Sequence, residues 1–143
     1  MPERHSAIGA LAEDEIPAAV ALWRATGLTR PWNDPVADAR RAFAAPAATI
    51  FAARIAGVLV GTAMTGHDGH RGWVYYLAVA ADHRGRGIAR QLMAAAEGWC
   101  AARGVPRLKL MVRAGNDPVI GFYQRIGYRA AAVVVLQKDL PSL

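Results

Sequence analysis

The chain has 143 residues, of which 54% are hydrophobic and 20% are charged, and its formal net charge at pH 7 is +6. A chain of this size and balance buries a sizeable core, so we expect residues 1–143 to form a single domain. No run of about 18 uncharged apolar residues occurs, which argues against a membrane-spanning helix. Residues 1–5 lack the apolar core of a signal peptide, and Cys100 is the only cysteine. We therefore expect a cytoplasmic protein without disulfides and without a metal site built from cysteines. We expect no other metal site either.

The positive charge favours an anionic partner, but its distribution argues against a large nucleic-acid surface. Arginines are spread along the whole chain and form no long basic run. We expect no DNA partner and no membrane partner, and RNA stays an alternative. A local anionic ligand such as a nucleotide cofactor explains Arg84 and Arg86, which lie close together beside glycines.

The first half of the chain contains short strand and helix patterns. Acidic residues before Pro17 mark one helix start, and Asp34 before Pro35 marks another, with Asp34 placed to cap the helix. Alternation of apolar residues on either side of Ala56-Gly57 predicts two strands joined by a turn. The predicted elements are a strand over 6–11, a helix that begins after the acidic residues 13–15 and stops at Gly27, a helix over 35–44, and strands over 49–55 and 58–65.

The second half adds a long strand, a glycine-rich turn and a long amphipathic helix. Ile88, Leu92 and Trp99 form an apolar stripe along that helix, and Asp117 before Pro118 is placed to cap a further helix. The predicted elements are a strand over 73–79, a helix from 88 to about 103, a strand over 107–112, a helix that begins at Pro118 and ends at Gly127, and a final strand over 133–136. This order predicts a mixed sheet with helices against its faces.

The turn between the long strand and the long helix has the features of a pyrophosphate site. Glycines let the backbone approach a ligand, and the helix that follows offers unpaired amides and the positive end of its dipole. The Rossmann fingerprint is excluded, because it needs three glycines early in a repeating series and an acidic residue about 20 positions later. The lysine of a P-loop is absent too. The residues of the turn are His83, Arg84, Gly85, Arg86, Gly87, Ile88 and Ala89.

Two spaced motifs narrow this anion site further. Arg84, Gly87 and Ala89 form an Arg-x-x-Gly-x-Ala pattern, and a second pattern about 30 residues later consists of Asn116, Phe122, Tyr123, Gly127 and Tyr128. With these motifs in this order the chain resembles the GNAT superfamily of N-acetyltransferases, and residues 28–35 and 68–72 look like its YpeA-type subgroup. The resemblance implies an α/β (α+β) fold with a mixed central sheet of about six to seven strands and about four flanking helices.

The resemblance also implies acetyl-CoA as the cofactor and assigns roles to residues. The backbone of the turn would hold the pyrophosphate, and the strand before it would pair with the pantetheine arm. The Val79 N–H would polarise the thioester carbonyl, and Tyr123 would protonate the departing thiolate. Core packing is the alternative role for Tyr123, and helix capping is the alternative for Asn116. The implied cofactor-binding residues are Leu77, Ala78, Val79, Arg84, Gly85, Arg86, Gly87, Ile88, Ala89, Asn116, Phe122 and Tyr123.

The acceptor amine must lose a proton, and the strand over 73–79 carries no carboxylate to take it. Two unusual loops supply candidates for an acceptor pocket, with polar groups beside a large aromatic side chain. Capping of a helix by Asp34 and a solvated turn around His70 are the alternatives. The candidate acceptor-binding residues are Arg30, Trp32, Asn33, Asp34, Asp68, His70, Arg71 and Tyr75.

These observations predict an N-acetyltransferase that moves an acetyl group from acetyl-CoA directly to a primary amine of a small molecule or a protein. A non-catalytic acyl-CoA-binding module is one alternative, favoured by the missing strand carboxylate. An RNA- or ribosome-directed acetyltransferase is another, favoured by the charge of +6. Few residues follow Gly127, so the acceptor cleft is expected to be open or to be completed by a second subunit in a homodimer.

Overall fold

The computed structural model describes residues 6–141, so the expectation about a signal peptide at residues 1–5 falls outside the described residues. The strands found in residues 6–141 are β1 Ala7–Ala10, β2 Ala48–Ile55, β3 Val58–His67, β4 Gly72–Val79 and β5 Leu108–Leu110. The sheet order is β1-β2-β3-β4-β5, with antiparallel pairs up to β4 and a parallel β4–β5 pair. The mixed α/β class is confirmed.

The chain divides into two compact units, which we call the N-terminal unit, Met1–Met111, and the C-terminal unit, Val112–Leu143. The N-terminal unit holds the sheet and three α-helices, and the C-terminal unit holds α4. The helices of residues 6–141 are α1 Ile16–Ala25, α2 Pro35–Ala44, α3 Ile88–Ala102 and α4 Asp117–Arg125, with short 3-10 turns η1 Glu13–Glu15 and η2 Ala81–His83.

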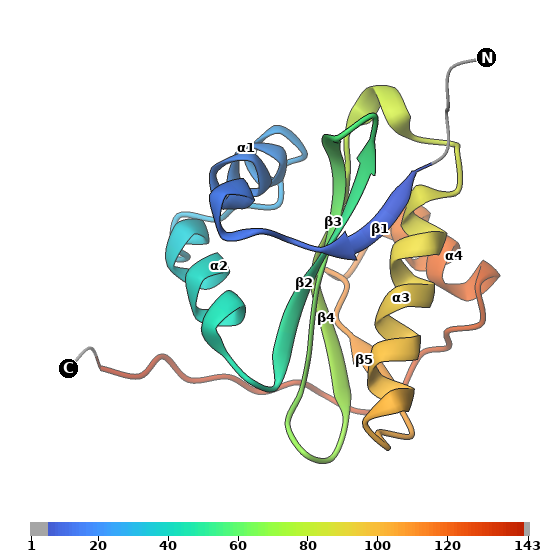
Figure 1. Cartoon of the computed structure of the whole chain (residues 1–143). Coiled ribbons are helices and arrows are strands. Elements are labelled where there is room, and N and C mark those ends of the chain that lie inside the picture. Colours follow the sequence, from blue (N-terminus) through green and yellow to red (C-terminus); the bar gives the residue numbers. More distant parts are fainter. Residues whose placement is uncertain (1–5, 142–143) are drawn as a thin grey trace. The chain divides into compact units, whose positions relative to one another are not determined.

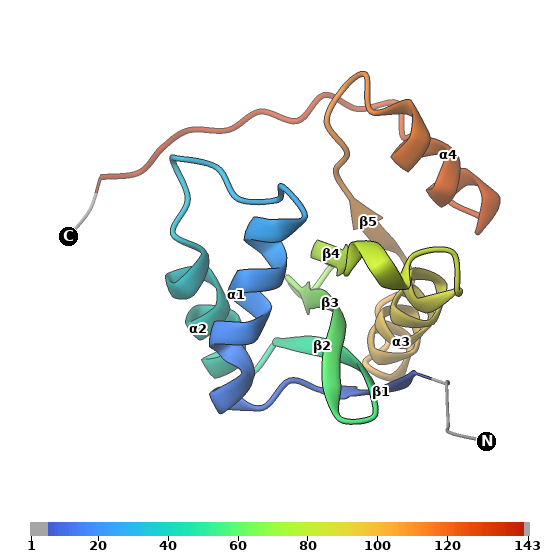
Figure 2. The ribbon, with the colours of Figure 1, turned by 90° about the horizontal axis from the view of Figure 1, so that it is seen from above.

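In the N-terminal unit α1 and α2 cover one face of the sheet and α3 covers the other (Figures 1 and 2). Trp23 of α1 is fully buried in the core between the first two helices and the sheet. On the other face α3 buries its apolar stripe, including Ile88 and Leu92. A Cβ at Gly72 would lie 2.5 Å from the Cys100 Sγ, so only glycine lets α3 approach β4 this closely.

The start of α2 follows its sequence signal, whereas the start of α4 departs from it. Asp34 caps α2 as predicted, because its Oδ1 accepts hydrogen bonds from Val36 N and Ala37 N, both at 3.1 Å. The predicted cap at Asp117 is wrong, since Asn116 occupies the cap position and Asp117 is the first helical residue. At that place the carboxylate of Asp117 favours the helix through its charge near the positive end of the dipole.

The predicted strand over 133–136 is wrong. The described part of the C-terminal unit has no strand there, and the side chains of Val133, Val134, Val135 and Leu136 are between 57% and 89% exposed. Three valines in a row have high β propensity, but a strand forms only where a neighbouring strand accepts its hydrogen bonds. The sheet therefore has five strands in residues 6–141, and the expectation of six to seven strands is corrected.

Candidate functional site

The glycine-rich turn between η2 and α3 has the backbone geometry of an anion site. Gly85 and Gly87 have φ angles of +80° and +79°, a conformation that L side chains rarely adopt. Apart from the chain neighbours, no described heavy atom lies within 4 Å of a Cβ built at either position, so there is open space beside each glycine. Gly87 is the N-cap of the 15-residue α3 and makes no side-chain capping hydrogen bond. The first amides of α3 therefore have no side-chain cap, and together with the helix dipole they suit an anion.

Two cationic side chains flank this turn. Arg84 and Arg86 are both exposed. The Nε of Arg84 donates a hydrogen bond of 3.3 Å to the carbonyl oxygen of Val79 at the end of β4. The turn is thus fastened to the last residue of the strand, and its positive charge lies beside that strand end.

A β-bulge interrupts β4 shortly before its end. Tyr75 pairs with Met64 and Ala78 pairs with Thr62, so two residues of β4 face one residue of β3. The bulge residue Tyr76 has φ +51°, in the left-handed region. For a residue other than glycine this conformation costs roughly 1–2 kcal/mol. Such strain persists only where surrounding contacts hold it, which makes the bulge a feature to explain.

The bulge decides which backbone groups of β4 face away from β3. Ala80 N donates to Val60 O at 2.8 Å, so Val60 directs its carbonyl toward β4. Backbone groups alternate between the two edges of a strand, so Val79 and Leu77 direct their N–H groups to the opposite edge. In a register without the bulge, Val79 would stand opposite Val60 and its N–H would be bound by β3. The extra residue turns the Val79 N–H outward.

The outer edge of β4 is covered along only part of its length. In the described residues β5 pairs with Gly72, Trp73 and Val74, and Gly72 N donates to Arg107 O at 2.9 Å. From Tyr75 to Val79 the described structure shows no strand paired on this edge. The N–H groups of Leu77 and Val79 therefore face an unpaired edge that ends at the glycine-rich turn. An extended ligand arm with its own amides fits this edge as an added strand.

Ala78 lies between the two outward residues and points the other way. Its backbone pairs with Thr62 of β3, and its side chain is buried in the core. Of the three β4 residues expected to bind a cofactor, the geometry thus favours Leu77 and Val79 and makes Ala78 a spacer.

The loop before α2 uses most of its polar groups internally. Arg30 donates from Nη1 to the carbonyl oxygens of Gly27 and Thr29, at 2.8 and 2.9 Å. Asn33 N donates to Arg30 O, and the Asp34 carboxylate caps α2. Trp32 projects from this loop with 71% of its surface exposed. The side chains of Trp32 and Asn33 are the exposed groups of this loop.

The β3–β4 hairpin is also internally bonded. The Oδ1 of Asp68 accepts from His70 N and Arg71 N at 2.9 and 2.8 Å, and its Oδ2 accepts from Trp73 Nε1 at 3.2 Å. These hydrogen bonds lower the pKa of Asp68 to about 2, and those from the backbone of Arg71 and His70 have the largest effect. A carboxylate with so low a pKa is a weak base, which argues against Asp68 as the group that takes the acceptor's proton.

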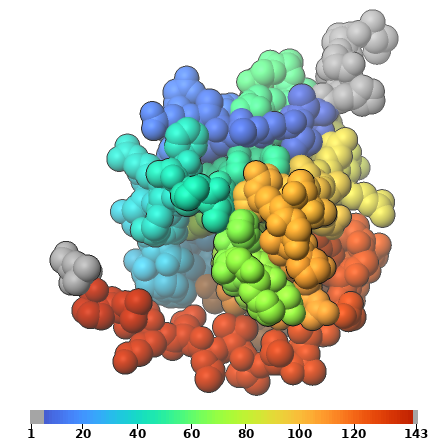
Figure 3. Space-filling view, turned by 60° about the horizontal axis from the view of Figure 1, so that its bottom comes forward, coloured from blue at the N-terminus to red at the C-terminus, as the bar shows by residue number. Residues whose placement is uncertain are grey.

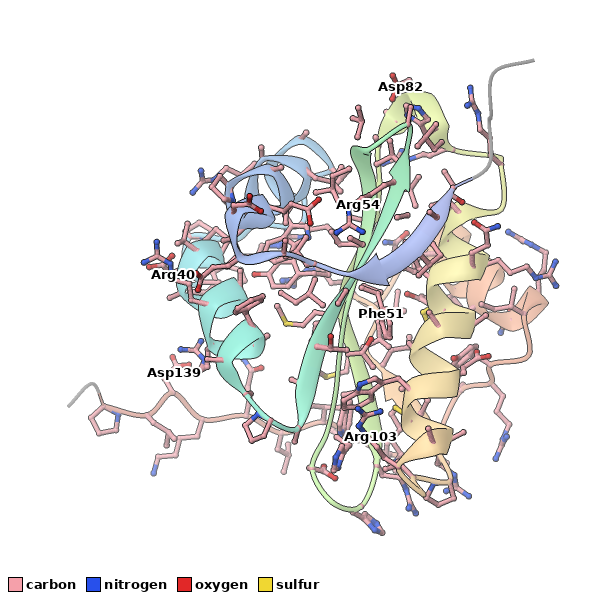
Figure 4. All side chains as sticks on the ribbon, in the orientation of Figure 1. Arg40, Phe51, Arg54, Asp82, Arg103 and Asp139 are labelled. Atoms are coloured by element: carbon pink, nitrogen blue, oxygen red, sulfur yellow. The ribbon has the colours of Figure 1, made fainter. Side chains whose placement is uncertain are left out.

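This hairpin lies at the far end of β4 from the glycine-rich turn. In Figure 4 Asp82 marks the turn end of the N-terminal unit and Arg103 marks the hairpin end. Val79 lies seven residue steps along β4 from Gly72, which at about 3.3 Å a step is roughly 23 Å. The sequence expectation placed Asp68, His70 and Arg71 in a pocket with the loop before α2, but the contacts found for them lie within the hairpin and β4.

The hairpin packs on the end of α3 instead. The ring of His67 lies 5.6 Å from that of Trp99, and the Arg103 guanidinium lies 3.9 Å over the Trp99 ring. Figure 3 shows the hairpin and the end of α3 side by side on this face. Tyr75, further along β4, is 45% exposed, and burial of part of its surface and the charge of Asp68 raise its pKa. Of the β4 tyrosines, Tyr75 is the one that the structure presents to solvent.

The C-terminal unit carries the second motif on α4 and the turn after it. Tyr123 makes edge contacts with Phe122 and Tyr128, with ring centroids 5.2 and 5.6 Å apart. Burial raises the pKa of Tyr123 to about 12, so its hydroxyl stays protonated at neutral pH. Asn116 makes no side-chain capping hydrogen bond within the described residues, which removes the capping alternative for its amide.

The sequence carries no signal for the bulge at Tyr76 or for its contacts with Thr62 and Asp38, because a bulge leaves no mark in an apolar alternation pattern. These contacts join residues 14 to 38 positions apart in the chain, so no local signal predicts them.

Comparison with known proteins identifies the family. Residues 17–128 match the model of the Acetyltransferase (GNAT) family, and the chain belongs to this family. An acetyltransferase of Pectobacterium atrosepticum is 43% identical over 128 residues, covering 90% of this chain and 91% of that protein. An uncharacterized N-acetyltransferase of Yersinia pestis is 41% identical over the same length and coverage.

Solved structures share the fold at much lower identity. The aminoglycoside acetyltransferase AAC(6')-Iy, in complex with the bisubstrate analogue CoA-S-monomethyl-acetylneamine, has a TM-score of 0.81 at 20% identity. The match covers 96% of this chain and 99% of that one. No helix in residues 6–141 is long and apolar enough to cross a membrane.

Proposed function

We propose that the protein is an acetyl-CoA-dependent N-acetyltransferase that moves the acetyl group directly to a primary amine. One observation carries the proposal: the unpaired edge of β4 presents the Val79 N–H immediately beside the glycine-rich turn at the start of α3. Family membership and the CoA-containing complex of a protein with the same fold support it. The two units would then work as one domain, and the cytoplasm would be its compartment.

The N-terminal unit suits two parts of the cofactor, its pyrophosphate and its pantetheine arm. The open turn and the first amides of α3 suit a pyrophosphate, with Arg84 and Arg86 adding charge. Leu77 and Val79 suit the amide-bearing pantetheine arm, which would run along β4 as an added strand. We assign pyrophosphate binding to the backbone of Arg84, Gly85, Arg86, Gly87, Ile88 and Ala89.

The bound cofactor would supply the acetyl group as a thioester. The outward N–H of Val79 would donate a hydrogen bond to the thioester carbonyl, where negative charge develops during transfer. Tyr123 would donate its proton to the departing sulfur, and its raised pKa keeps that proton in place at neutral pH. Asn116 and Phe122 would contact the pantetheine arm, as the family resemblance implies.

The acceptor would meet exposed groups of the N-terminal unit. Trp32, Asn33 and Tyr75 are exposed. Aromatic faces attract cationic amines, which is the charge state in which most primary amines reach the enzyme. We assign acceptor contact to these three residues. Arg30, Asp34, Asp68 and Arg71 have structural bonds within their own loops, and we assign no base role to either carboxylate.

The test combines binding with turnover. Calorimetry with CoA and acetyl-CoA should give dissociation constants in the micromolar range or below, and a panel of small amines and peptides should release free thiol from acetyl-CoA. Binding of CoA without thiol release for any amine would favour a binding module. The absence of any CoA binding would refute the proposal.

A further inference from the structure

The bulge residue Tyr76 is held at three separate places, by three different elements. Its carbonyl oxygen accepts a hydrogen bond of 2.9 Å from Thr62 Oγ1 on β3. Its ring stacks on Trp23 of α1, with centroids 4.0 Å apart and planes 16° apart. Its hydroxyl donates to Asp38 Oδ2 on α2 at 2.8 Å. The backbone, the ring and the hydroxyl of one strained residue each have a specific partner.

The partners are themselves fixed. Trp23 Nε1 donates to Thr62 Oγ1 at 2.8 Å, so one indole both stacks on Tyr76 and orients the hydroxyl that binds its carbonyl. Trp23 and Thr62 are fully buried. The other oxygen of Asp38 accepts from Arg41 Nη2 at 2.8 Å. Burial and the hydrogen bond to Asp38 raise the pKa of Tyr76 to about 12, so its hydroxyl remains a donor at all physiological pH values.

We propose that Asp38, Trp23 and Thr62 are positioning residues that act through Tyr76 to set the direction of the Val79 N–H. The inference rests on the proposed function for its kinetic consequence, but not for its structural one. Loss of the bulge would move β4 by one residue relative to β3, and Val79 would then turn its N–H toward Val60. We call Tyr76 and its three partners, Asp38, Trp23 and Thr62, the lock. It connects α2, which follows the loop assigned to the acceptor amine, with the β4 edge assigned to acetyl-CoA.

Two substitutions loosen the lock with little loss of volume or core packing. Tyr76→Phe removes the hydroxyl and keeps the stacked ring, and Asp38→Ala removes the acceptor from the other side. Asp38→Asn keeps an acceptor oxygen and should rescue. Arg41→Ala is the matched control, because it breaks the ion pair with Asp38 and leaves the Tyr76–Asp38 hydrogen bond intact. The Arg41 side chain is 73% exposed, so its loss should not disturb the core.

Kinetics and amide NMR of the full chain test the proposal together. We expect Tyr76→Phe and Asp38→Ala to lower kcat by about tenfold, a fraction of the effect of deleting a charge-stabilising donor, with KM for acetyl-CoA changing less. Asp38→Asn and Arg41→Ala should stay within about threefold of the parent protein. In the ligand-free protein the amide signals of Leu77 and Val79 should shift or broaden in Tyr76→Phe and Asp38→Ala, and should stay unchanged in Arg41→Ala.

The outcomes separate the lock from the proposed function. Equal effects of Asp38→Ala and Arg41→Ala would overturn the lock, as would a loss of thermal stability alone with unchanged kcat and unchanged Val79 signals. If the parent protein bound no CoA, the proposed function would fail. The ligand-free spectra would still decide about the lock, since an unchanged Val79 amide in Tyr76→Phe refutes it and a shifted one supports it.

Discussion

Gly87 at the start of α3 and Gly98 within α3 are expected to change the stability in opposite directions when each is replaced by alanine. Gly87 is the N-cap of α3 and has φ +79°, whereas Gly98 lies inside α3 with an ordinary helical backbone. Apart from the chain neighbours and, for Gly98, the backbone of the helix itself, no described heavy atom lies within 4 Å of a Cβ built at either position. Steric clash is thus absent from both, and only the backbone conformation distinguishes them. We predict that Gly87→Ala lowers the free energy of unfolding and Gly98→Ala raises it.

The difference between the two variants is the quantity that the structure predicts. Replacing glycine by alanine reduces the entropy of the unfolded chain equally in both, a gain of roughly 0.4–1 kcal/mol. Only Gly87→Ala adds the penalty of a left-handed alanine, roughly 1–2 kcal/mol. Gly98→Ala should therefore be more stable than Gly87→Ala by at least about 1–2 kcal/mol, with the helix propensity of alanine adding to this difference. Urea unfolding at equilibrium measures both values.

CoA binding adds a second test of the same turn. Relaxation of the left-handed turn would redirect the first amides of α3, so Gly87→Ala should weaken CoA binding by about tenfold or more, and Gly98→Ala should not change it. Calorimetry measures both. If Gly87→Ala were as stable as Gly98→Ala, the left-handed conformation at Gly87 would be wrong. If it lost stability but bound CoA normally, the turn would not be the pyrophosphate site.

Three further predictions test the other groups. Tyr123→Phe should lower kcat by about 10²-fold or more while the dissociation constant of CoA changes little, as expected for a general acid; equal losses in stability with unchanged kcat would assign the ring to packing. The pKa of Glu15 is lowered to about 2, mainly by its hydrogen bond with Arg54, so this pair adds stability above pH 4.5 that is lost as the pH falls toward 2. The stability difference between the parent protein and Glu15→Gln, measured by urea unfolding, should shrink over that range, and a constant difference would contradict the ion pair. Gly72→Ala should lower the free energy of unfolding by about 1–3 kcal/mol, because its Cβ would clash with the Cys100 Sγ. The same substitution in a Cys100→Ala background should lower it clearly less. Additive effects of the two substitutions in urea unfolding would refute the direct contact.

Local chemistry predicted much of the fold that positions the site. Asp34 and Pro35 mark the start of α2, and the structure confirms the capping bonds of Asp34. The glycine-rich turn also has a local cause, since left-handed backbone at Gly85 and Gly87 is a property of those residues themselves. These features depend only on neighbouring residues, so they can be predicted from a single sequence.

Features that depend on a distant partner escaped prediction. Residues 133–136 have the composition of a strand, but composition supplies no neighbour, and the described segment stays exposed. Asp68 beside His70 and Arg71 suggested an acceptor pocket, whereas the Asp68 carboxylate accepts hydrogen bonds from Trp73 Nε1 and from the backbone of the turn. In both places the residue types allow more than one role, and the contacts made in the folded chain determine which role is observed.

The register of β4 is the most consequential of these distant effects. Gly72 and Val74 direct their backbone groups to the outer edge before the bulge, as the pairing with β5 shows, and Leu77 and Val79 do so after it. The alternation of outward backbone groups along β4 thus changes once, at Tyr76, two residues after Val74, the last β4 residue that pairs with β5. Because β5 ends there, the newly exposed amides meet open edge instead of a strand. One extra residue with a left-handed backbone, held by a tryptophan, a threonine and an aspartate from elsewhere in the chain, therefore determines which residues of this strand are available to a ligand.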